Sequence, residues 1–393
     1  MLRNTTVGID IGTHQIKVVV GELVNVNNKP YTKIIGTGIA ESKGLRHGYI
    51  VNGADVTASI ETAVKMAEKA SGIKINKAFI AVGGIGLTSV ASTGNTIVSR
   101  ADLQITEMDI EKASINCEEN IPNNLIQNQK ILHSIPLSYK IDGKPILSKS
   151  PLDMKGTKLE VKMLFVTCLE PHLNDLLEAV DETGIDVIDV MASPIAASFA
   201  TLSKLQKTAG CVLVNIGSET MSIVVFENNI PVSLEVFPIG STDITNDIAL
   251  GLKIPLEEAE NIKIGSIGSG SYPKKKLEEI ISARLTDMFE LVENHLKKIG
   301  RNGLLPAGVF ITGGGSGIGM IEDFAKGALK LPSRIAELNL NDQKTNVKDS
   351  TWSVAYGLCM LGLSKEEKTN LGLRYSGYKI WNKVFNWLKQ FSP

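Results

Sequence analysis

The chain has 393 residues, which is more than one ordinary domain holds, so we expect two lobes. Its 43% hydrophobic and 21% charged residues are typical of a globular protein, and its net charge of −1 gives no overall field that would attract nucleic acid, so we expect no nucleic-acid partner. The four cysteines form no CxxC pair and the five histidines form no HExxH motif, which disfavours a disulfide framework or a metal site held by side chains alone.

Short strands open the chain, and a helix follows them. The N-terminus leads directly into a strand and not into a signal peptide, and no stretch approaches the ~20 apolar residues that span a bilayer. Turns rich in glycine and asparagine separate the predicted strands Thr6–Asp10, Ile16–Leu23 and Tyr31–Ala40. Apolar spacing predicts a helix over Ala54–Ser71 that ends at Gly72, and Lys77–Val82 has the pattern of a buried strand.

From about residue 84 to residue 160 the sequence has a different pattern of polar and apolar residues. It contains a polar strand region, a predicted helix over Glu107–Glu119, and a predicted strand over Ile131–Ile141 that ends in a turn. We interpret this segment as a small α+β insertion. The strand Val161–Cys168 resumes the earlier apolar pattern, and Pro171–Thr183 is a predicted helix.

The opening pattern returns after residue 205. The strand Cys211–Ile216, a turn, the strand Met221–Phe226, an asparagine turn and the strand Ile230–Pro238 follow in the order seen about 205 residues earlier. This internal repeat predicts two related lobes more securely than chain length does.

Helices dominate residues 241–303, interrupted by the low-complexity loop Gly265–Lys276. The predicted strand Val309–Thr312 then leads into the glycine-rich stretch Gly313–Gly317. A helix over Met320–Lys330 follows, and Val354–Leu363 is the last predicted helix of the body.

The two copies of the repeat carry turns suited to binding phosphate. In the first, Gly12 lets backbone N–H groups approach an anion, the hydroxyl of Thr13 adds a donor, and Asp10 can hold a hydrated Mg²⁺ ion. The second copy, Asn215–Thr220, places a similar turn on the other lobe, so the two turns can hold a polyphosphate from both sides. The stretch Gly313–Gly317 follows a strand and opens a helix whose N-terminus can receive a phosphate or the adjoining ribose.

The last residues of the chain form a predicted amphipathic helix. Its apolar positions fill about half of a helical wheel, and polar residues with three lysines and no acidic residue fill the other half. This composition is typical of an interfacial helix attracted to anionic lipid, although a terminal helix docked on the body or on a partner is the alternative. The predicted membrane-binding residues are Tyr378, Lys379, Ile380, Trp381, Lys383, Val384, Phe385, Trp387, Leu388, Lys389 and Phe391.

These turns resemble the nucleotide-binding loops of the actin/Hsp70/sugar-kinase superfamily, and four features resemble the FtsA family of bacterial cell-division proteins. The features are Asp10–Thr13 with Lys17, the motif Ser42–Gly48, the end of the insertion at Pro151–Glu160, and the C-terminal helix. The resemblance implies an actin-like α/β fold of two lobes, built from duplicated RNase H-like subdomains with an SHS2-type inserted subdomain, 1C. The implied boundaries are 1–83 and 161–205 for subdomain 1A, 84–160 for 1C, 206–240 and 304–363 for 2A, 241–303 for 2B, 364–376 for a hinge and 377–393 for a membrane-targeting helix.

The resemblance also implies a binding site for ATP and Mg²⁺. The implied nucleotide-binding residues are Asp10, Gly12, Thr13, His14 and Lys17 in the first phosphate loop; Asn215, Gly217, Ser218, Glu219 and Thr220 in the second; Glu260 and Lys263 toward the ribose and adenine; and Gly313, Gly314, Gly315 and Ser316 in the adenosine loop. Asp10 would hold Mg²⁺ through water. From the residues alone, Glu260 and Lys263 could equally be a solvated surface ion pair.

The family implies several partners and a location. The C-terminal peptide of the tubulin-like protein FtsZ would dock on subdomain 2B, further copies of the chain would add to a filament, and 1C would contact neighbouring subunits and later division proteins. Anionic lipid would bind the tail, at the cytoplasmic face of the bacterial cell membrane at the division site.

The sequence departs from the superfamily pattern in the second phosphate loop. Asn215 stands where aspartate is usual, and Ser218 and Glu219 stand where two glycines are usual. Because general-base help is worth ~10²–10⁴ in rate, losing that carboxylate predicts ATP binding with little or no hydrolysis.

Three other hypotheses are open. An ATP-dependent sugar or acetate kinase of the same fold would need a catalytic aspartate and leaves the tail unexplained. A dinucleotide site at Gly315–Gly319, with Glu337 as its acidic residue, leaves the repeat unexplained. A type IV pilus-type scaffold shares the fold and insertion and lacks a lipid-binding tail. The bound nucleotide and vesicle binding would separate these hypotheses.

Overall fold

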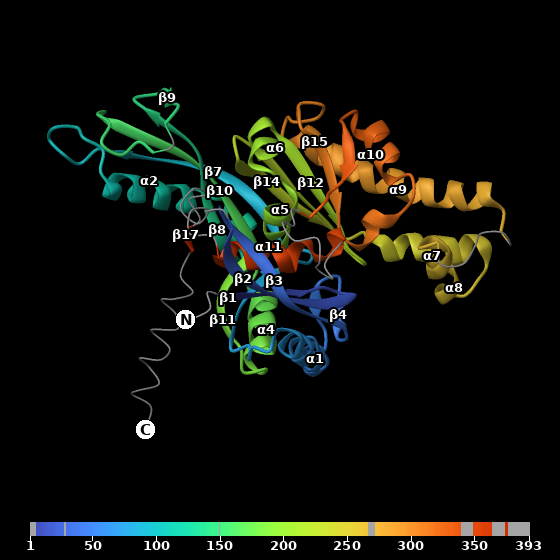
Figure 1. The fold of residues 1–393 in the computed structure, drawn as a ribbon. Helices are drawn as coiled ribbons and strands as arrows, with labels where there is room; N and C mark the ends of the chain where they lie inside the picture. The colour runs from blue at the N-terminus through green and yellow to red at the C-terminus, as the bar shows by residue number, and fades with distance from the viewer. Residues whose placement is uncertain are drawn as a thin grey trace. The chain divides into compact units, whose positions relative to one another are not determined.

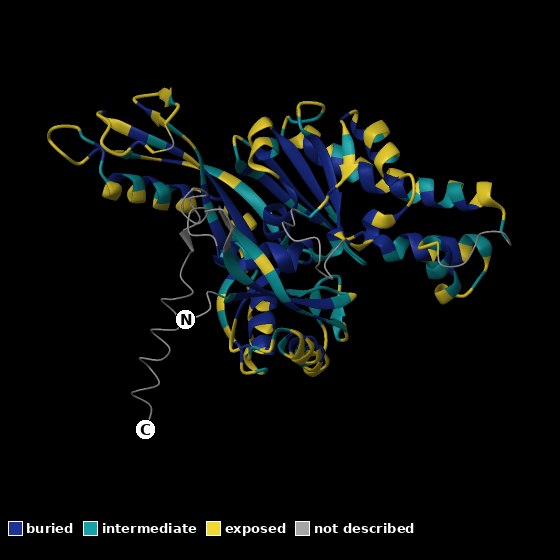
Figure 2. Cartoon of the chain, viewed as in Figure 1, coloured by how far each residue is buried: buried dark blue, intermediate teal, exposed yellow. Residues whose placement is uncertain are grey.

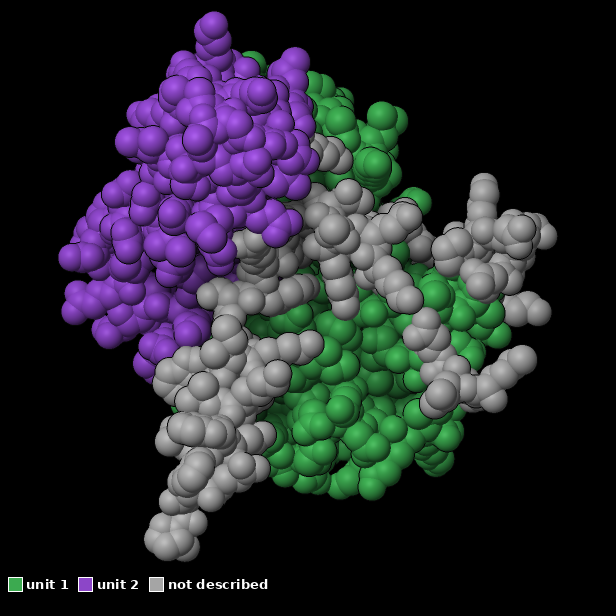
Figure 3. Space-filling model, turned by 90° about the vertical axis from the view of Figure 1, so that its left-hand side faces the viewer, with its two compact units in different colours: residues 1–87, 172–364 green, residues 88–171, 365–393 purple. Residues whose placement is uncertain are grey.

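The computed structural model describes residues 5–26, 29–148, 150–265, 272–338, 349–363 and 374–375 (Figure 1). The predicted C-terminal helix lies outside the described residues, as do most of the hinge 364–376 and half of the loop 265–276. The chain divides into two compact units, shown in two colours in Figure 3. Unit 1 comprises residues 1–87 and 172–364, and unit 2 comprises residues 88–171 and 365–393.

The first sheet of unit 1 begins with an antiparallel meander. Its strands are β1 (Thr5–Ile11), β2 (Gln15–Val26), β3 (Lys29–Glu41), β6 (Lys77–Val82) and β11 (Asp186–Ala192), in the order β11-β6-β1-β2-β3. The strands β6 and β11 run parallel to β1. Helix α1 (Gly53–Ser71) packs on β3, where a Cβ on Gly38 would lie 1.8 Å from the carbonyl oxygen of Ala63. As predicted, α1 ends at Gly72, which has a φ of 69°.

The second sheet of unit 1 repeats this topology. Its strands are β12 (Cys211–Ile216), β13 (Met221–Glu227), β14 (Ile230–Phe237), β15 (Gly308–Thr312) and β16 (Ser333–Ile335), in the order β14-β13-β12-β15-β16. In register, Asp10 pairs with Lys17 in the first sheet, and Asn215 pairs with Ser222 in the second. The internal repeat is therefore confirmed strand by strand. Figure 2 shows most of β12, β13 and β15 of the second sheet as buried.

The remaining elements of unit 1 cover and connect these sheets. They are β4 (Leu45–Arg46), β5 (Tyr49–Ile50), α4 (Glu170–Asp181), α5 (Ser193–Thr201), α6 (Lys204–Ala209), α7 (Ser241–Leu252), α8 (Leu256–Lys263), α9 (Lys274–Lys298), α10 (Ile321–Leu329) and α11 (Ser353–Leu363), with short 3-10 turns over Gly314–Gly317 and Ser350–Trp352. The apolar faces of α7, α8, α9 and α10 join the buried core of the second sheet. Helices α7, α8 and α9 lie within residues 241–303, which were predicted to be helical, and this burial holds them against the sheet.

The final helices of the two repeats cross each other. Helix α11 follows the second repeat but packs on β1, β2 and β6 of the first sheet, whereas α5 follows the first repeat and reaches β12 and β13 of the second. Gly357 permits the crossing, because a Cβ there would lie 1.9 Å from the carbonyl oxygen of Ala196. A Cβ on Gly8 would likewise lie 2.3 Å from the carbonyl oxygen of Ala355. The two halves of unit 1 therefore share one tightly packed seam.

Unit 2 is an antiparallel sheet with a helix on one face. Its elements are β7 (Thr88–Ile97), α2 (Glu107–Glu119), α3 (Asn123–Ile126), β8 (Gln129–Ile141), β9 (Lys144–Ile146), β10 (Lys158–Leu169) and β17 (Arg374–Tyr375). The order is β17-β8-β10-β7, and β9 pairs with β8. Helix α2 packs on β7 and β10, and Ala113 and Cys117 on α2 share a core with Phe165 on β10.

The predicted end of the insertion at residue 160 needs correction. Strand β10 pairs with β7 and β8 along its length, so residues 161–169 belong to the insertion, and unit 2 continues to Pro171. The apolar pattern of this strand reflects burial, which is the same whichever sheet the strand joins. The described part of the predicted hinge, Arg374–Tyr375, adds a short strand beside His133 and Ser134 of β8.

Candidate functional site

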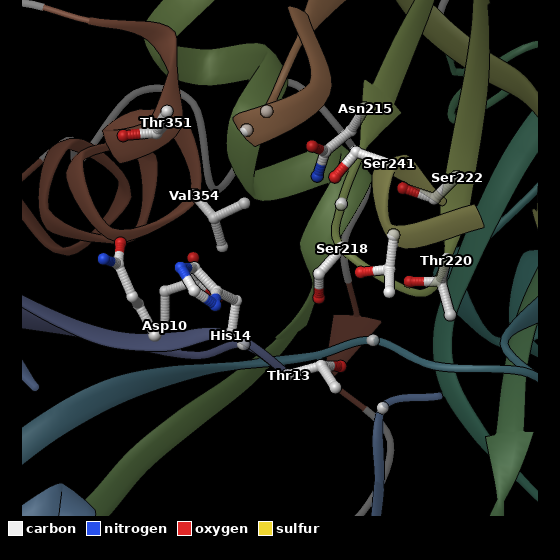
Figure 4. A pocket seen from close by; sticks show the side chains of 18 of the residues that line it. Asp10, Thr13, His14, Asn215, Ser218, Thr220, Ser222, Ser241, Thr351 and Val354 are labelled. Carbon is white, nitrogen blue, oxygen red and sulfur yellow. The ribbon is translucent and has the colours of Figure 1, made fainter. Parts of the chain in front are cut away.

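A cavity of about 1060 Å³ lies in unit 1 where the β1–β2 and β12–β13 turns meet α7, α8 and the start of α11. Figure 4 shows side chains from both turns around it, with Asp10, Thr13 and His14 from the first and Asn215, Ser218 and Thr220 from the second. The fold thus brings residues about 205 positions apart to one place.

The two turns have matching backbone geometry. A Cβ on Gly12 would lie 2.9 Å from the carbonyl oxygen of Gln15, and a Cβ on Gly217 would lie 2.9 Å from that of Thr220. Each turn is therefore too tight for a side chain at its glycine. The start of α7 fixes the second turn, because the N–H of Ser241 donates to the carbonyl oxygen of Gly217 at 2.9 Å.

Asp10 and Lys17 form a charged pair at the base of the cavity. Burial raises the pKa of the Asp10 carboxyl to about 6, although attraction to Lys17 opposes this rise. Burial also lowers the pKa of Lys17, against the attraction of Asp10 and Asp349, and its Nζ donates to the carbonyl oxygen of Thr351 at 3.0 Å. A carboxylate held above its ordinary pKa lacks counter-charge, which a hydrated cation beside it would supply.

A single carboxylate suits a hydrated Mg²⁺ ion better than a caged one. The described residues contain no group of three or more histidine, cysteine, aspartate or glutamate side chains placed to hold a metal. Mg²⁺ usually keeps several waters and binds through one or two carboxylates together with the phosphates of its ligand. Asp10 fits that role, with Thr13 beside it in the same turn.

On α8, Glu260 and Lys263 form a partly buried network. The Lys263 side chain is only 7% exposed, and its Nζ contacts Glu260 at 2.7 Å, the Thr245 hydroxyl at 2.8 Å and the Ser241 carbonyl at 3.1 Å. Burial raises the pKa of the Glu260 carboxyl, but hydrogen bonds from Lys263 and Thr245 hold it below its ordinary value. The hypothesis of a solvated surface pair is therefore wrong for Lys263, which holds Glu260 at the cavity wall.

The same face of α8 contributes residues that the sequence analysis missed. Leu256 and Ile264 line the cavity although they are 58% and 59% exposed, and Asn261 lies between them. Exposed apolar side chains beside an amide suit a planar ring with polar edges. Leu256, Glu260 and Ile264 follow one another at intervals of four residues, and this helical spacing was the available signal.

The glycine-rich stretch after β15 divides between the cavity and the core. Gly313 and Gly314 line the cavity, and a Cβ on Gly313, whose φ is 88°, would lie 2.3 Å from Asn215 Oδ1. Gly315 and Ser316 are absent from the lining: a Cβ on Gly315 would lie 2.4 Å from Ile216, and the Ser316 hydroxyl donates to the Gly313 carbonyl at 2.7 Å.

The predicted helix opening at this stretch also differs. A 3-10 turn over Gly314–Gly317 comes first, and α10 begins at Ile321, outside the cavity lining. Three glycines favour a tight turn over helix continuation, so the N-terminus of α10 is displaced from the cavity.

Glu219 is turned away from the cavity. It does not line the cavity, and its carboxylate accepts the backbone N–H of His47. Conversely, Gly48, Gly83 and His172 line the cavity without having been predicted to do so. Gly83 directly follows Val82, the last residue of β6.

None of the helices in the described part of the chain has the length and apolar content needed to cross a bilayer.

Comparisons with known families match two parts of the chain. The family described as "Cell division protein FtsA" matches residues 212–357, and the family described as "SHS2 domain inserted in FTSA" matches residues 84–167. The cell division protein FtsA of Bacillus subtilis is 30% identical over 374 residues, covering 90% of this chain and 82% of the relative. The FtsA protein of Pseudomonas aeruginosa is 29% identical over 382 residues, covering 92% of this chain and 89% of the relative.

Solved structures share the fold at lower identity. A "PilM-PilN type IV pilus biogenesis complex" matches with a TM-score of 0.67 at 17% identity, covering 91% of this chain and 98% of the other. MreB5 of Spiroplasma citri bound to ADP matches with a TM-score of 0.53 at 12% identity, covering 93% and 98%. These likenesses show an actin-like fold.

Proposed function

The chain belongs to the FtsA family of cell-division proteins, and on that premise we propose that it is a nucleotide-binding scaffold that tethers FtsZ filaments to the membrane. An actin-like division protein of this kind has two tasks, which different parts of the chain would perform. The cavity of unit 1 would bind ATP with Mg²⁺. The C-terminal helix would bind the cytoplasmic face of the membrane.

Two features support nucleotide binding. The two matching tight turns lie around one cavity, and Asp10 and Lys17 line the same cavity. Backbone N–H groups and hydroxyls of the two turns would hold the phosphates, and Lys17 would add a positive charge. Bound Mg²⁺ would neutralise phosphate charge, with Asp10 holding its water shell. Glu260 would accept hydroxyl groups of the ribose, and Leu256 and Ile264 would contact the base.

We expect little or no hydrolysis in this cavity. Asn215 occupies the place that corresponds to Asp10, and its amide cannot act as a general base. A lost general base costs ~10²–10⁴ in rate. Titration with fluorescent ATP in Mg²⁺ tests binding, and phosphate release tests turnover. A steady-state rate near about 1 s⁻¹, within the ordinary enzyme range, would contradict the proposal.

Membrane tethering rests on the sequence of the tail and on family membership. A single amphipathic helix binds reversibly, whereas a filament that presents many tails binds tightly, so polymerisation and membrane binding would be coupled. The FtsZ peptide would bind the α7–α9 region, and the insertion would contact neighbouring copies and later division proteins.

Sedimentation with anionic vesicles and FtsZ filaments tests tethering. We expect the full chain to bring FtsZ down with the vesicles, and a chain ending at Tyr375 to leave both in the supernatant. Neutral vesicles are the control for the lysines of the tail. If neither chain sediments with anionic vesicles, the tail is a docking helix and the tether proposal fails.

The alternatives have less support. The pilus-type complex matches the fold over 91% of the chain at 17% identity, whereas the two FtsA proteins match a similar share of the chain at 29% and 30% identity. No feature of the cavity favours a small-molecule kinase.

A further inference from the structure

A small hairpin in the first half of unit 1 touches the second phosphate-binding turn. Its strands are β4 and β5, in which Leu45 pairs with Ile50 and Arg46 pairs with Tyr49. His47 and Gly48 form the two-residue turn, with φ values of 49° and 83°. Positive φ at both positions is the signature of a type I′ turn, whose twist suits a tight hairpin. The motif Ser42–Gly48 ends in this hairpin; Gly48 lines the cavity, and the proposed nucleotide contacts give no role to His47 beside it.

The hairpin is fixed to its own half of the unit. A Cβ on Gly48 would lie 2.4 Å from Gly84 Cα, so the two backbones are in direct contact. The N–H of Ile85 donates to the His47 carbonyl at 3.3 Å, and the Tyr49 hydroxyl donates to the Ile85 carbonyl. The hairpin therefore moves together with the end of β6.

The tip of the hairpin bonds to the other half. The backbone N–H of His47 donates to Glu219 Oε2 at 2.5 Å, and His47 Nδ1 lies 3.3 Å from the Glu219 carbonyl oxygen. Glu219 stands between Ser218 and Thr220, which both line the cavity. One residue of the second turn thus faces the hairpin while its two neighbours face the site. A glycine, which the superfamily pattern has here, could not make the carboxylate contact.

We propose that His47 and Glu219 form a clasp across the cavity that slows the exchange of bound nucleotide. This inference rests on the proposed nucleotide binding and adds its regulation. Nucleotide held between the two turns leaves when the halves separate, and separation must break the bond to the Glu219 carboxylate. Hydrogen bonds to charged groups are stronger than neutral ones, so their loss changes an equilibrium by about 10- to 100-fold.

The test is the rate at which excess ATP displaces a fluorescent ATP analogue from the full chain, measured by stopped flow. We expect Glu219→Ala to raise the dissociation rate about 10- to 100-fold and to raise the association rate too, so that Kd changes less than either rate. His47→Gly keeps the positive φ and the N–H and loses only the ring contact, so its effect should be smaller. Glu61→Ala, which removes an exposed carboxylate paired with Lys65 on α1, is the matched control.

A second measurement examines the clasp without nucleotide. The His47 amide should be protected from hydrogen exchange in the wild-type chain, and Glu219→Ala should reduce this protection about 10- to 100-fold with no change in α1. A dissociation rate within about twofold of wild type in Glu219→Ala overturns the clasp. If the wild-type chain binds no nucleotide, the proposed function fails together with the clasp's role in exchange, and the amide protection still decides whether the contact exists.

Discussion

Asp10→Asn should stabilise the nucleotide-free protein and abolish its Mg²⁺-dependent binding of ATP. In the free protein the Asp10 carboxyl has a pKa of about 6, raised by burial from an ordinary 3.8. Each pKa unit corresponds to about 1.4 kcal/mol, so ionised Asp10 costs the folded state about 3 kcal/mol at pH 7.5. Asparagine has nearly the same shape and no charge to bury. The substitution should therefore raise the free energy of unfolding by up to about 3 kcal/mol.

The pH dependence has a definite sign. Because the folded-state pKa is raised, the folded protein keeps a proton between about pH 4 and pH 6 that the unfolded chain has lost. The cost of ionised Asp10 is therefore complete above about pH 6 and disappears as the pH falls to about 4. The increase in the free energy of unfolding caused by Asp10→Asn should therefore be complete above about pH 6 and disappear as the pH falls to about 4.

Urea unfolding at several pH values, with and without Mg²⁺ and ATP, checks these expectations. Saturating ligand at 100 times its Kd adds about 2.7 kcal/mol to the wild-type protein, and the variant should gain much less. Asp186→Asn, on a side chain 73% exposed and paired only at the surface with Lys77, is the control and should change stability by less than about 0.5 kcal/mol. If Asp10→Asn is less stable than wild type at pH 7.5 without nucleotide, the buried-carboxylate argument is refuted.

Four further substitutions test other parts of the chain. Lys263→Ala removes the ammonium group that pairs with Glu260 at the cavity wall. Fluorescence titration should then show the Kd for ATP rising about tenfold or more. Gly357→Ala should lower the free energy of unfolding in urea by about 1–3 kcal/mol, because its Cβ would meet the Ala196 carbonyl. Gly327→Ala, in α10 with open space around it, should instead add about 0.5–1 kcal/mol. Trp381→Glu in the predicted C-terminal helix should weaken sedimentation with anionic vesicles about tenfold or more, and undiminished binding would show that this helix is not the anchor.

Most strands and helices of the fold were predictable from local pattern. The bounds of β6, α2 and β12 agree with the predicted Lys77–Val82, Glu107–Glu119 and Cys211–Ile216. Sheet membership was harder, because a buried strand such as β10 has the same apolar run in either sheet. The internal repeat overcame this difficulty for unit 1, since the second copy must follow the order of the first.

The candidate site also has parts that were predictable from the sequence and parts that were not. The two turns were predictable, because glycine and hydroxyl residues recur at matching places in the repeat. The contacts of Gly48 with Gly84 and of His47 with Glu219 join segments far apart in the chain, and no local pattern marks them. Likewise, only the structure shows that the Ser316 hydroxyl donates to the Gly313 carbonyl and does not line the cavity.

The crossing of α5 and α11 has a consequence for synthesis on the ribosome. The first sheet is complete once β11 has been made, but the helix that covers β1 and β2 is among the last described segments of the chain. During elongation that apolar face has no partner from its own chain, and contacts between distant segments form slowly. A chain released early would keep this face uncovered and be open to chaperones and proteases. Only a nascent chain that has been made as far as α11 can therefore bury this face of its first sheet.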